Sequence, residues 1–103
     1  MSWAKHAKEA LARGEVTTIK PRGNSMKGKV ESGTAVEVSP CDSKDLSVGD
    51  IVLVRVSGRD YLHIVKAVQG NRFQIGNNRG GINGWVGPKA IHGIATKIGE
   101  DNA

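Results

Sequence analysis

The chain has 103 residues and a formal net charge of +5, with 38% hydrophobic but only 4% aromatic residues. This length allows one small domain with an aliphatic core. No apolar run reaches the ~20 residues that a membrane-spanning helix needs, and the first residues lack the apolar core of a signal peptide. A single cysteine, Cys41, excludes an internal disulfide and is typical of a reducing compartment. We therefore expect a soluble cytoplasmic protein without a membrane partner.

The positive charge is unevenly distributed along the chain. The first 30 residues carry seven basic and two acidic side chains, whereas the remainder carries eight of each. A basic segment of this kind attracts nucleic acid or an acidic protein partner, or it forms a solvated surface without a partner.

The first predicted element is a short amphipathic helix over residues 2–13. Ser2 is expected to cap its start and Gly14 to end it. Because so short a helix is unstable alone, we expect it to dock on the rest of the domain. It is too small for a helix-turn-helix DNA reader. The residues that share its apolar side at helical spacing are Trp3, Ala7, Ala10 and Leu11.

The remainder of the chain reads as mainly β, because 14 glycines mark many turns between short apolar runs. A hairpin turn is expected at 57–60, and 76–81 is expected to be the loosest segment. The predicted organisation is an N-terminal helical segment 1–15 packed on a β domain 16–98, followed by a tail 99–103. The predicted strands cover residues 16–19, 34–38, 51–56, 61–68, 72–75 and part of 90–98.

The segment 21–33 carries the first residue with chemical potential, Ser25. Gly23 and Gly28 flank this serine and permit a positive φ or a close backbone approach, which favours an exposed hydroxyl. Two lysines make the neighbourhood electropositive. The alternative is an ordinary loop serine, because Gly-Asn-Ser stretches commonly form turns.

A possible base for this serine lies 38 residues later, at His63. A serine hydroxyl is a weak nucleophile until a base within hydrogen-bond reach takes its proton, and histidine titrates near neutral pH. Strand alternation places His63 and Lys66 on opposite faces, so the two are alternative bases unless a bulge intervenes. The alternative for His63 is a histidine at a sheet surface.

Taken in order, these motifs resemble the LexA-like and signal-peptidase-like serine peptidases over residues 19–98. The resemblance implies a LexA/signal-peptidase-like β-fold, with Ser25 as nucleophile and His63 as general base. A lysine is the base in the LexA-like and bacterial signal peptidases, and a histidine replaces it in the archaeal and endoplasmic-reticulum signal peptidases. It also implies a substrate bound in extended form against a sheet edge. The matching motifs are Gly-Asn-Ser-Met at 23–26, Gly33, Gly-Asp-Ile-Val-Leu-Val at 49–54 and the strand that carries His63.

An acyl-transfer mechanism also needs a donor for the oxyanion, which a backbone N–H of Ser25 or Met26 would supply. Gly23 and Gly28 would allow a substrate strand to lie close. Met26 lines a substrate pocket in one interpretation and belongs to the core in the other, and the core is favoured.

The residue that would orient His63 is not an obvious acid. The histidine-type signal peptidases carry one acidic residue in the segment that resembles 76–78 and another shortly afterwards, whereas this chain has asparagines at 77 and 78 and no acid over 79–87. Asn83 is the remaining candidate, because an amide oxygen also holds a histidine tautomer, although it stabilises imidazolium less than a carboxylate does.

The sequence therefore predicts a serine peptidase-like protein that uses a Ser–His dyad on a peptide or protein substrate. No cofactor is expected, and one cysteine with three scattered histidines forms no recognisable metal site. The alternative is a catalytically inactive module of the same fold that binds nucleic acid or an acidic protein through the basic N-terminal region. The few aromatic residues do not form a recognisable platform for stacking bases.

Overall fold

In a computed structural model of the chain, the structure of residues 4–23 and 25–99 is described. The predicted cap Ser2 and the predicted docking residue Trp3 lie outside these ranges, as does the predicted tail apart from its first residue.

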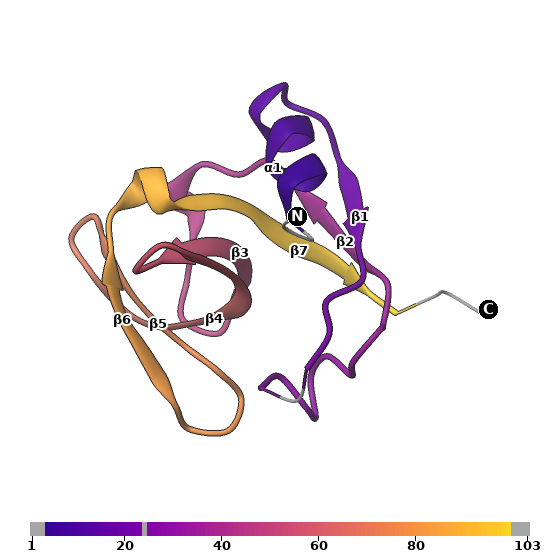
Figure 1. The fold of residues 1–103 in the computed structure, drawn as a ribbon. Coiled ribbons are helices and arrows are strands. Elements are labelled where there is room, and N and C mark those ends of the chain that lie inside the picture. The colour runs from indigo at the N-terminus through magenta and orange to yellow at the C-terminus, as the bar shows by residue number, and fades with distance from the viewer. Residues whose placement is uncertain (1–3, 24, 100–103) are drawn as a thin grey trace.

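One helix and one antiparallel sheet of seven strands make up the described fold, in the strand order β1-β2-β7-β3-β4-β5-β6. Figure 1 shows the helix α1 beside β1 and β2. The predicted class, mainly β with a short N-terminal helix, is confirmed. Two 3₁₀ turns and the strand β6 were not predicted. The elements are α1 (Lys5–Ala12), β1 (Thr17–Ile19), β2 (Val36–Ser39), η1 (Ser43–Asp45), β3 (Ile51–Val56), β4 (Arg59–Gln69), β5 (Arg72–Gly76), β6 (Ile82–Val86), η2 (Pro88–Ala90) and β7 (Ile91–Ile98).

The helix α1 begins after Ala4 without a side-chain cap, and Gly14, two residues beyond its last residue, terminates it as predicted. Gly14 has a φ of +81°, and its N–H donates to the Leu11 carbonyl at 3.0 Å, while the Glu15 N–H donates to the Ala10 carbonyl at 2.9 Å. This pair of bonds is a Schellman motif, which needs the left-handed conformation that glycine adopts without strain.

The apolar side of α1 packs on the sheet, as predicted for Leu11. Ala4, Ala7 and Leu11 are buried in a cluster with side chains from β1, β2 and β3. Gly93 on β7 permits this contact, because a Cβ there would lie 3.0 Å from Leu11 Cδ2 and 2.7 Å from the Ser39 carbonyl oxygen. The absence of a side chain at position 93 of β7 therefore allows the helix to approach the sheet.

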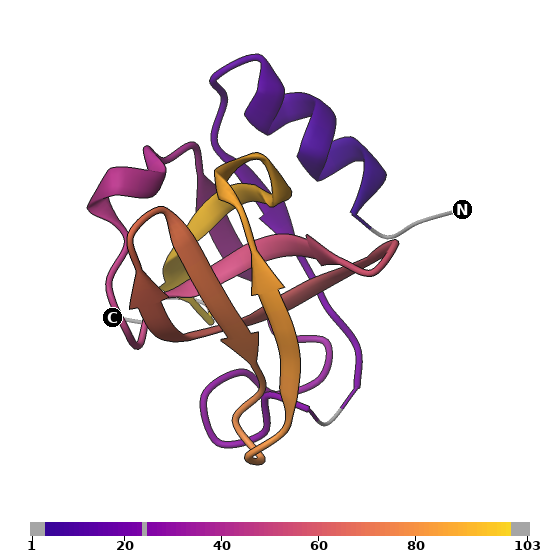
Figure 2. The ribbon, with the colours of Figure 1, turned by 90° about the vertical axis from the view of Figure 1, so that its left-hand side faces the viewer.

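The central strand β3 divides the core into two clusters. Leu53 faces the helix-side cluster, whereas Val52, Val54 and Val56 face a second cluster with side chains from β4, β5 and β6. The sheet curls so that β6 approaches β3: a Cβ on Gly84 would lie 3.9 Å from Val56 Cγ1. Figure 2 shows β5 and β6 folded across β3 and β4. This curl brings β6 side chains within reach of β4.

The β3–β4 hairpin turns in only two residues. Ser57 has a φ of +50° and Gly58 a φ of +81°, the combination of a type I′ turn. Val56 therefore pairs directly with Arg59, and β4 begins two residues earlier than the predicted strand 61–68. This places Arg59 and Asp60 within the strand rather than in a loop.

Candidate active site

The loop 21–33 is closed on itself and anchored in the core. The Gly33 N–H donates to the Pro21 carbonyl at 2.8 Å. Inside the loop, the N–H groups of residues 29 and 30 both donate to the Met26 carbonyl. These two hydrogen bonds close one helical turn. The Met26 side chain, 5% exposed, is buried in the helix-side cluster. Ser25 therefore precedes a residue that the core holds in place, and the predicted core position of Met26 is observed.

A second segment, the turn between β5 and β6, holds the Ser25 loop from outside. The Asn78 N–H donates to the Ser25 carbonyl at 2.9 Å, and Asn78 Nδ2 donates to the Lys27 carbonyl at 2.8 Å. Figures 1 and 2 show this turn beside the loop. Gly28 has a φ of +99°, and a Cβ there would lie 3.0 Å from Asn78 Nδ2. We expected Gly28 to make room for a substrate, but Asn78 occupies that space.

The same turn is well organised, although 76–81 was expected to be the loosest segment. Asn77 Oδ1 accepts hydrogen bonds from the N–H groups of Arg79 at 2.8 Å and Gly81 at 2.9 Å. The Asn77 N–H donates to the Gly81 carbonyl at 2.9 Å. The asparagines at 77 and 78 thus shape the turn and fasten it to the Ser25 loop.

The structure brings Ser25, His63 and Asn83 together. His63 Nε2 lies 3.1 Å from Ser25 Oγ, and His63 Nδ1 lies 2.6 Å from Asn83 Oδ1. An amide oxygen only accepts hydrogen bonds. Nδ1 of His63 therefore carries the proton and donates a hydrogen bond to Asn83 Oδ1. The lone pair of Nε2 then faces the Ser25 hydroxyl, which is the arrangement that proton abstraction requires.

Two bulges shape the strands around this site. In the β5–β6 pairing Ile75 faces Gly84 and Gly76 faces Ile82, which leaves Asn83 as the extra residue. In the β4–β5 pairing Lys66 is left over in the same way. A bulge redirects the side chain of the extra residue. Asn83 can therefore reach from β6 across β5 to His63 on β4.

The environment of His63 keeps its imidazole neutral. The side chain is 4% exposed, and the ring stacks on Tyr61 with centroids 4.6 Å apart and planes at 26°. Burial lowers the pKa of His63 below 6.5, the hydrogen bond to Asn83 acts in the opposite direction, and the charge of Lys66 lowers the pKa further. At pH 7 the base is therefore unprotonated.

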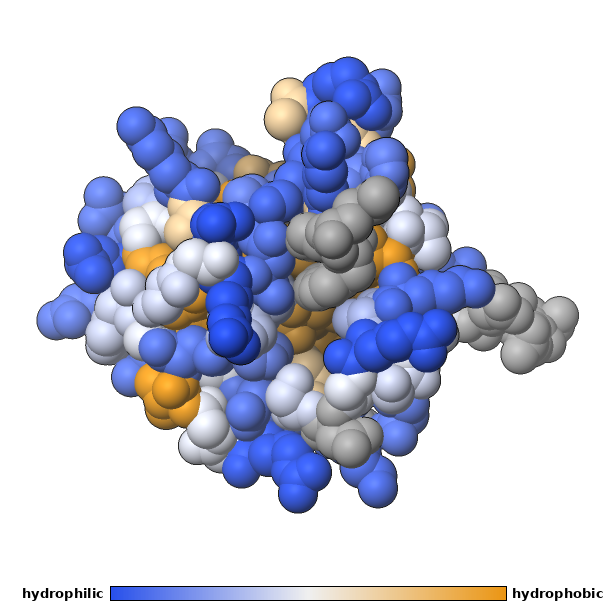
Figure 3. All heavy atoms as spheres, viewed as in Figure 1, coloured by the Kyte–Doolittle hydropathy of each residue, from blue (hydrophilic) through white to orange (hydrophobic). Residues whose placement is uncertain are grey.

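A cavity of about 620 Å³ opens beside Ser25 and His63, bounded by the loop 21–33, the helix and the β3–β4 hairpin. Figure 3 shows a recess in this face, with apolar atoms at its floor between hydrophilic side chains. Gly23 lines the cavity with open space where a Cβ would be, but its N–H donates to Ser32 Oγ at 3.1 Å. Within residues 4–23 and 25–99, the N–H groups of Ser25 and Met26 have no hydrogen-bond acceptor. The Ser25 and Met26 N–H groups thus remain without an acceptor in this part of the chain, whereas the Gly23 N–H is already engaged.

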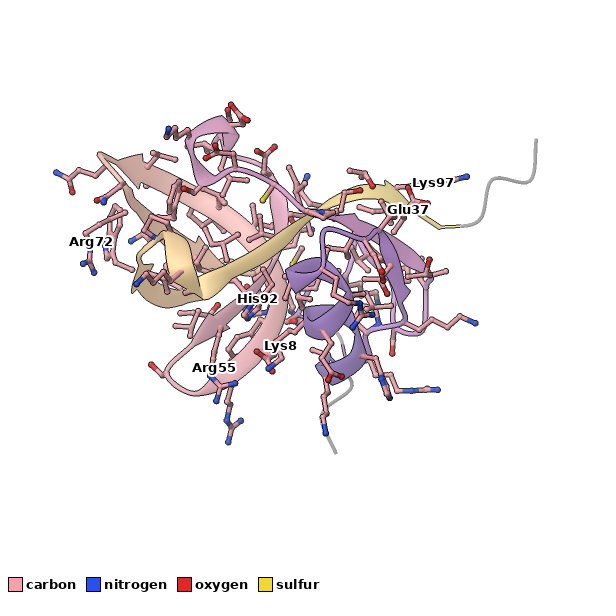
Figure 4. All side chains as sticks on the ribbon, turned by 90° about the horizontal axis from the view of Figure 1, so that it is seen from above. Lys8, Glu37, Arg55, Arg72, His92 and Lys97 are labelled. Atoms are coloured by element: carbon pink, nitrogen blue, oxygen red, sulfur yellow. The ribbon has the colours of Figure 1, made fainter. Side chains whose placement is uncertain are left out.

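A group of charged residues next to the cavity was not predicted. Asp60 Oδ2 lies 2.9 Å from Lys8 Nζ, and its Oδ1 lies 3.7 Å from Arg55 Nη1 and 3.8 Å from His92 Nε2. Figure 4 shows Lys8, Arg55 and His92 close together. The sequence predicted Asp60 as part of a turn over 57–60. The Ser-Gly pair at 57–58 indicates a two-residue turn instead, and such a turn places Asp60 in β4.

Neither a cluster of metal ligands nor a membrane-spanning helix is found in the described part of the chain. There, no group of three or more His, Cys, Asp or Glu side chains is arranged to hold a metal ion. Among helices formed by residues 4–23 and 25–99, none is long and apolar enough to cross a bilayer.

Comparison with known proteins does not assign a family. No family model matches the chain, and no curated protein matches it either. The functional interpretation therefore depends on the geometry of the site and on the motifs in the sequence.

Proposed function

We propose that this chain is a serine peptidase related to the LexA-like and signal-peptidase-like enzymes, which cleaves a peptide or protein bound in extended form. The observation that carries the proposal is the Ser25 Oγ–His63 Nε2 contact of 3.1 Å, with His63 Nδ1 held by Asn83 at 2.6 Å. A loop serine without catalytic function does not need a buried, oriented and neutral base at its hydroxyl. Because Cys41 is the one cysteine in the chain, we place this activity in the cytoplasm.

The proposed reaction uses each of these groups in turn. His63 Nε2 takes the Ser25 proton as Oγ attacks the substrate carbonyl carbon, and the N–H of Ser25 or Met26 stabilises the resulting oxyanion. The protonated Nε2 then gives its proton to the leaving amine as the peptide C–N bond breaks. Water, deprotonated by the same Nε2, hydrolyses the acyl-enzyme and releases Ser25 with its proton restored.

Asn83 limits the rate of this reaction. Its oxygen fixes the tautomer of His63 through Nδ1, but it carries no full negative charge to stabilise the imidazolium that forms during attack. Burial and the Lys66 charge also disfavour that imidazolium. We therefore propose an enzyme that turns over more slowly than a Ser-His-Asp peptidase and keeps its base ready at neutral pH.

The test of this proposal is covalent labelling by a fluorophosphonate, which reacts with activated serines. We expect one adduct per wild-type chain, located at Ser25 by mass spectrometry, and no adduct in Ser25→Ala. Ser47→Ala is the matched control, because Ser47 is exposed and outside the cavity. Circular dichroism establishes that all three proteins fold.

Absence of an adduct in folded wild-type protein would contradict the peptidase proposal. It would favour the inactive binding module, whose affinity for nucleic acid through the basic N-terminal region should fall steeply between ~50 and ~200 mM salt.

A further inference from the structure

The cavity beside Ser25 has cationic walls. The helix, the loop 21–33 and the β3–β4 hairpin all contribute basic side chains to it, and among residues 4–23 and 25–99 these outnumber the lining carboxylates by four to two. The basic residues are Lys8, Arg22, Arg55 and Arg59, and the carboxylates are those of Glu31 and Asp60.

Both carboxylates already have partners in the fold. Asp60, with a side chain only 6% exposed, contacts Lys8 at 2.9 Å and Arg55 at 3.7 Å. Glu31 Oε2 accepts a hydrogen bond from the Gly28 N–H at 2.9 Å. In contrast, Arg22 and Arg59 are exposed and form no ion pair with any residue of 4–23 or 25–99. Two guanidinium groups in the cavity wall are therefore available to a ligand.

The chain itself limits how far these groups lie from the reaction centre. Arg22 precedes Ser25 by three residues, which span at most about 11 Å. Arg59 precedes His63 by four residues of the strand β4, which span about 13 Å. An extended substrate advances about 3.3 Å per residue, so the backbone of both arginines lies within the length of about four substrate residues from the Ser25–His63 pair.

We propose that this site selects peptides with an acidic side chain, Asp or Glu, within about four residues of the cleaved bond. The inference rests on the proposed peptidase function and adds the class of its substrate. A guanidinium group binds a carboxylate through two parallel N–H donors, so Arg22 and Arg59 discriminate between a carboxylate and an amide of the same shape.

A peptide fits this cavity better than a nucleic acid does. Apolar side chains of Met26, Val30 and Leu62 line it beside the charges, which suits a chain of mixed side chains. Among the described residues, Tyr61 contributes the one Phe, Tyr or Trp ring of the wall; because it is stacked on His63, no second such ring of these residues is present to sandwich a base.

The experiment compares nine-residue alanine-rich peptides that carry one Glu or one Gln at each successive position. With wild-type protein at low salt we expect about tenfold higher kcat/KM for Glu than for Gln at one or more positions. The double variant Arg22→Gln/Arg59→Gln should reduce this ratio to about twofold or less. The matched control is Arg72→Gln, an exposed arginine that lies far from Lys8 and Arg55 in Figure 4 and should retain the preference.

The outcomes separate this inference from the proposed function. Equal kcat/KM for Glu and Gln peptides, in wild-type protein that the fluorophosphonate labels, would overturn the acidic preference and leave the peptidase intact. If labelling fails, anisotropy with Ser25→Ala and fluorescent peptides decides: about tenfold tighter binding of the Glu peptide supports the acidic site without catalysis. Equal binding of both peptides, or tighter binding of a single-stranded oligonucleotide that the double variant loses, would overturn it.

Discussion

Two histidines of the same sheet have different surroundings, although burial lowers the pKa of both. His63 on β4 makes hydrogen bonds with both ring nitrogens, at 3.1 Å to Ser25 and 2.6 Å to Asn83. His92 on β7 faces the carboxylate of Asp60 at 3.8 Å, and its Nε2 is buried without a hydrogen-bond partner among the described residues.

The two surroundings fit different roles: that of His63 fits the proposed catalysis, and that of His92 fits a contribution to stability. Neither ring nitrogen of His63 contacts a carboxylate of the described residues, yet each proton position is fixed by a neutral acceptor. The group around His92 has a carboxylate, but Asp60 is engaged by Lys8 from α1 and lies near Arg55 from β3. An acid beside a histidine is therefore less informative here than two short hydrogen bonds to its ring.

The largest expected effect follows from replacing one histidine at a time. His63→Gln removes the proposed base for the Ser25 proton, so the rate of fluorophosphonate labelling should fall about 1,000-fold. His92→Gln should leave the rate within about threefold, because His92 does not contact Ser25. The rates are measured at pH 7 on proteins whose folding is verified by circular dichroism. Similar losses in both variants would show that the comparison between the two sites is wrong.

The next largest effect is on stability, and it follows from disrupting the cluster of charged residues around Asp60. Asp60→Asn removes the carboxylate that partners Lys8 at 2.9 Å and leaves this half-buried ammonium uncompensated. We expect the free energy of unfolding, measured in urea, to fall by about 2 kcal/mol. The control Asp45→Asn, at an exposed position, should change it by less than about 0.5 kcal/mol. Equal effects of the two substitutions would mean that the group does not brace the helix.

Local patterns in the sequence predicted much of the sheet and the Ser25–His63 pair. The strand Ile51–Val56 was predicted with its observed limits, because an unbroken apolar run between turn residues is a strong local signal. The spacing of Ser25 and His63 was informative through the family resemblance. Asn83 was identified because the segment lacks acids, but the bulge that directs it could not be predicted, since β6 itself was not.

The features that the sequence did not predict depend on long-range contacts. Asn78 reaches Lys27 across 51 residues of sequence, and Asp60 reaches Lys8 across 52. Neither contact leaves a periodic pattern, because each depends on how the curled sheet brings distant loops together. The asparagines at 77 and 78 were considered only as positions that lack an acid, and their role in shaping the β5–β6 turn and holding the Ser25 loop was missed.

A smaller effect is expected when the acceptor at His63 gains a charge. In Asn83→Asp the carboxylate favours the protonated imidazole, so the pKa of His63 should rise. Labelling needs neutral His63 and therefore increases with pH through this pKa. The midpoint should lie at a higher pH in the variant than in wild-type protein, where burial lowers the pKa of His63. The control Asn71→Asp, in the exposed β4–β5 turn, adds the same charge elsewhere and should not move the midpoint.

The smallest effect tests how the Ser25 loop is held. Gly28→Ala and Gly33→Ala both place a side chain at positive φ, +99° and +79°, and so share the cost of backbone strain. Only the Cβ at position 28 would meet Asn78 Nδ2, at 3.0 Å, whereas nothing lies within 4 Å at position 33. We expect Gly28→Ala to lower the free energy of unfolding by about 1 kcal/mol more than Gly33→Ala, since it weakens the Asn78 hydrogen bond to Lys27. It should also slow labelling, because Asn78 holds the Ser25 carbonyl. Equal stability and equal labelling in the two variants would mean that Asn78 does not position the nucleophile.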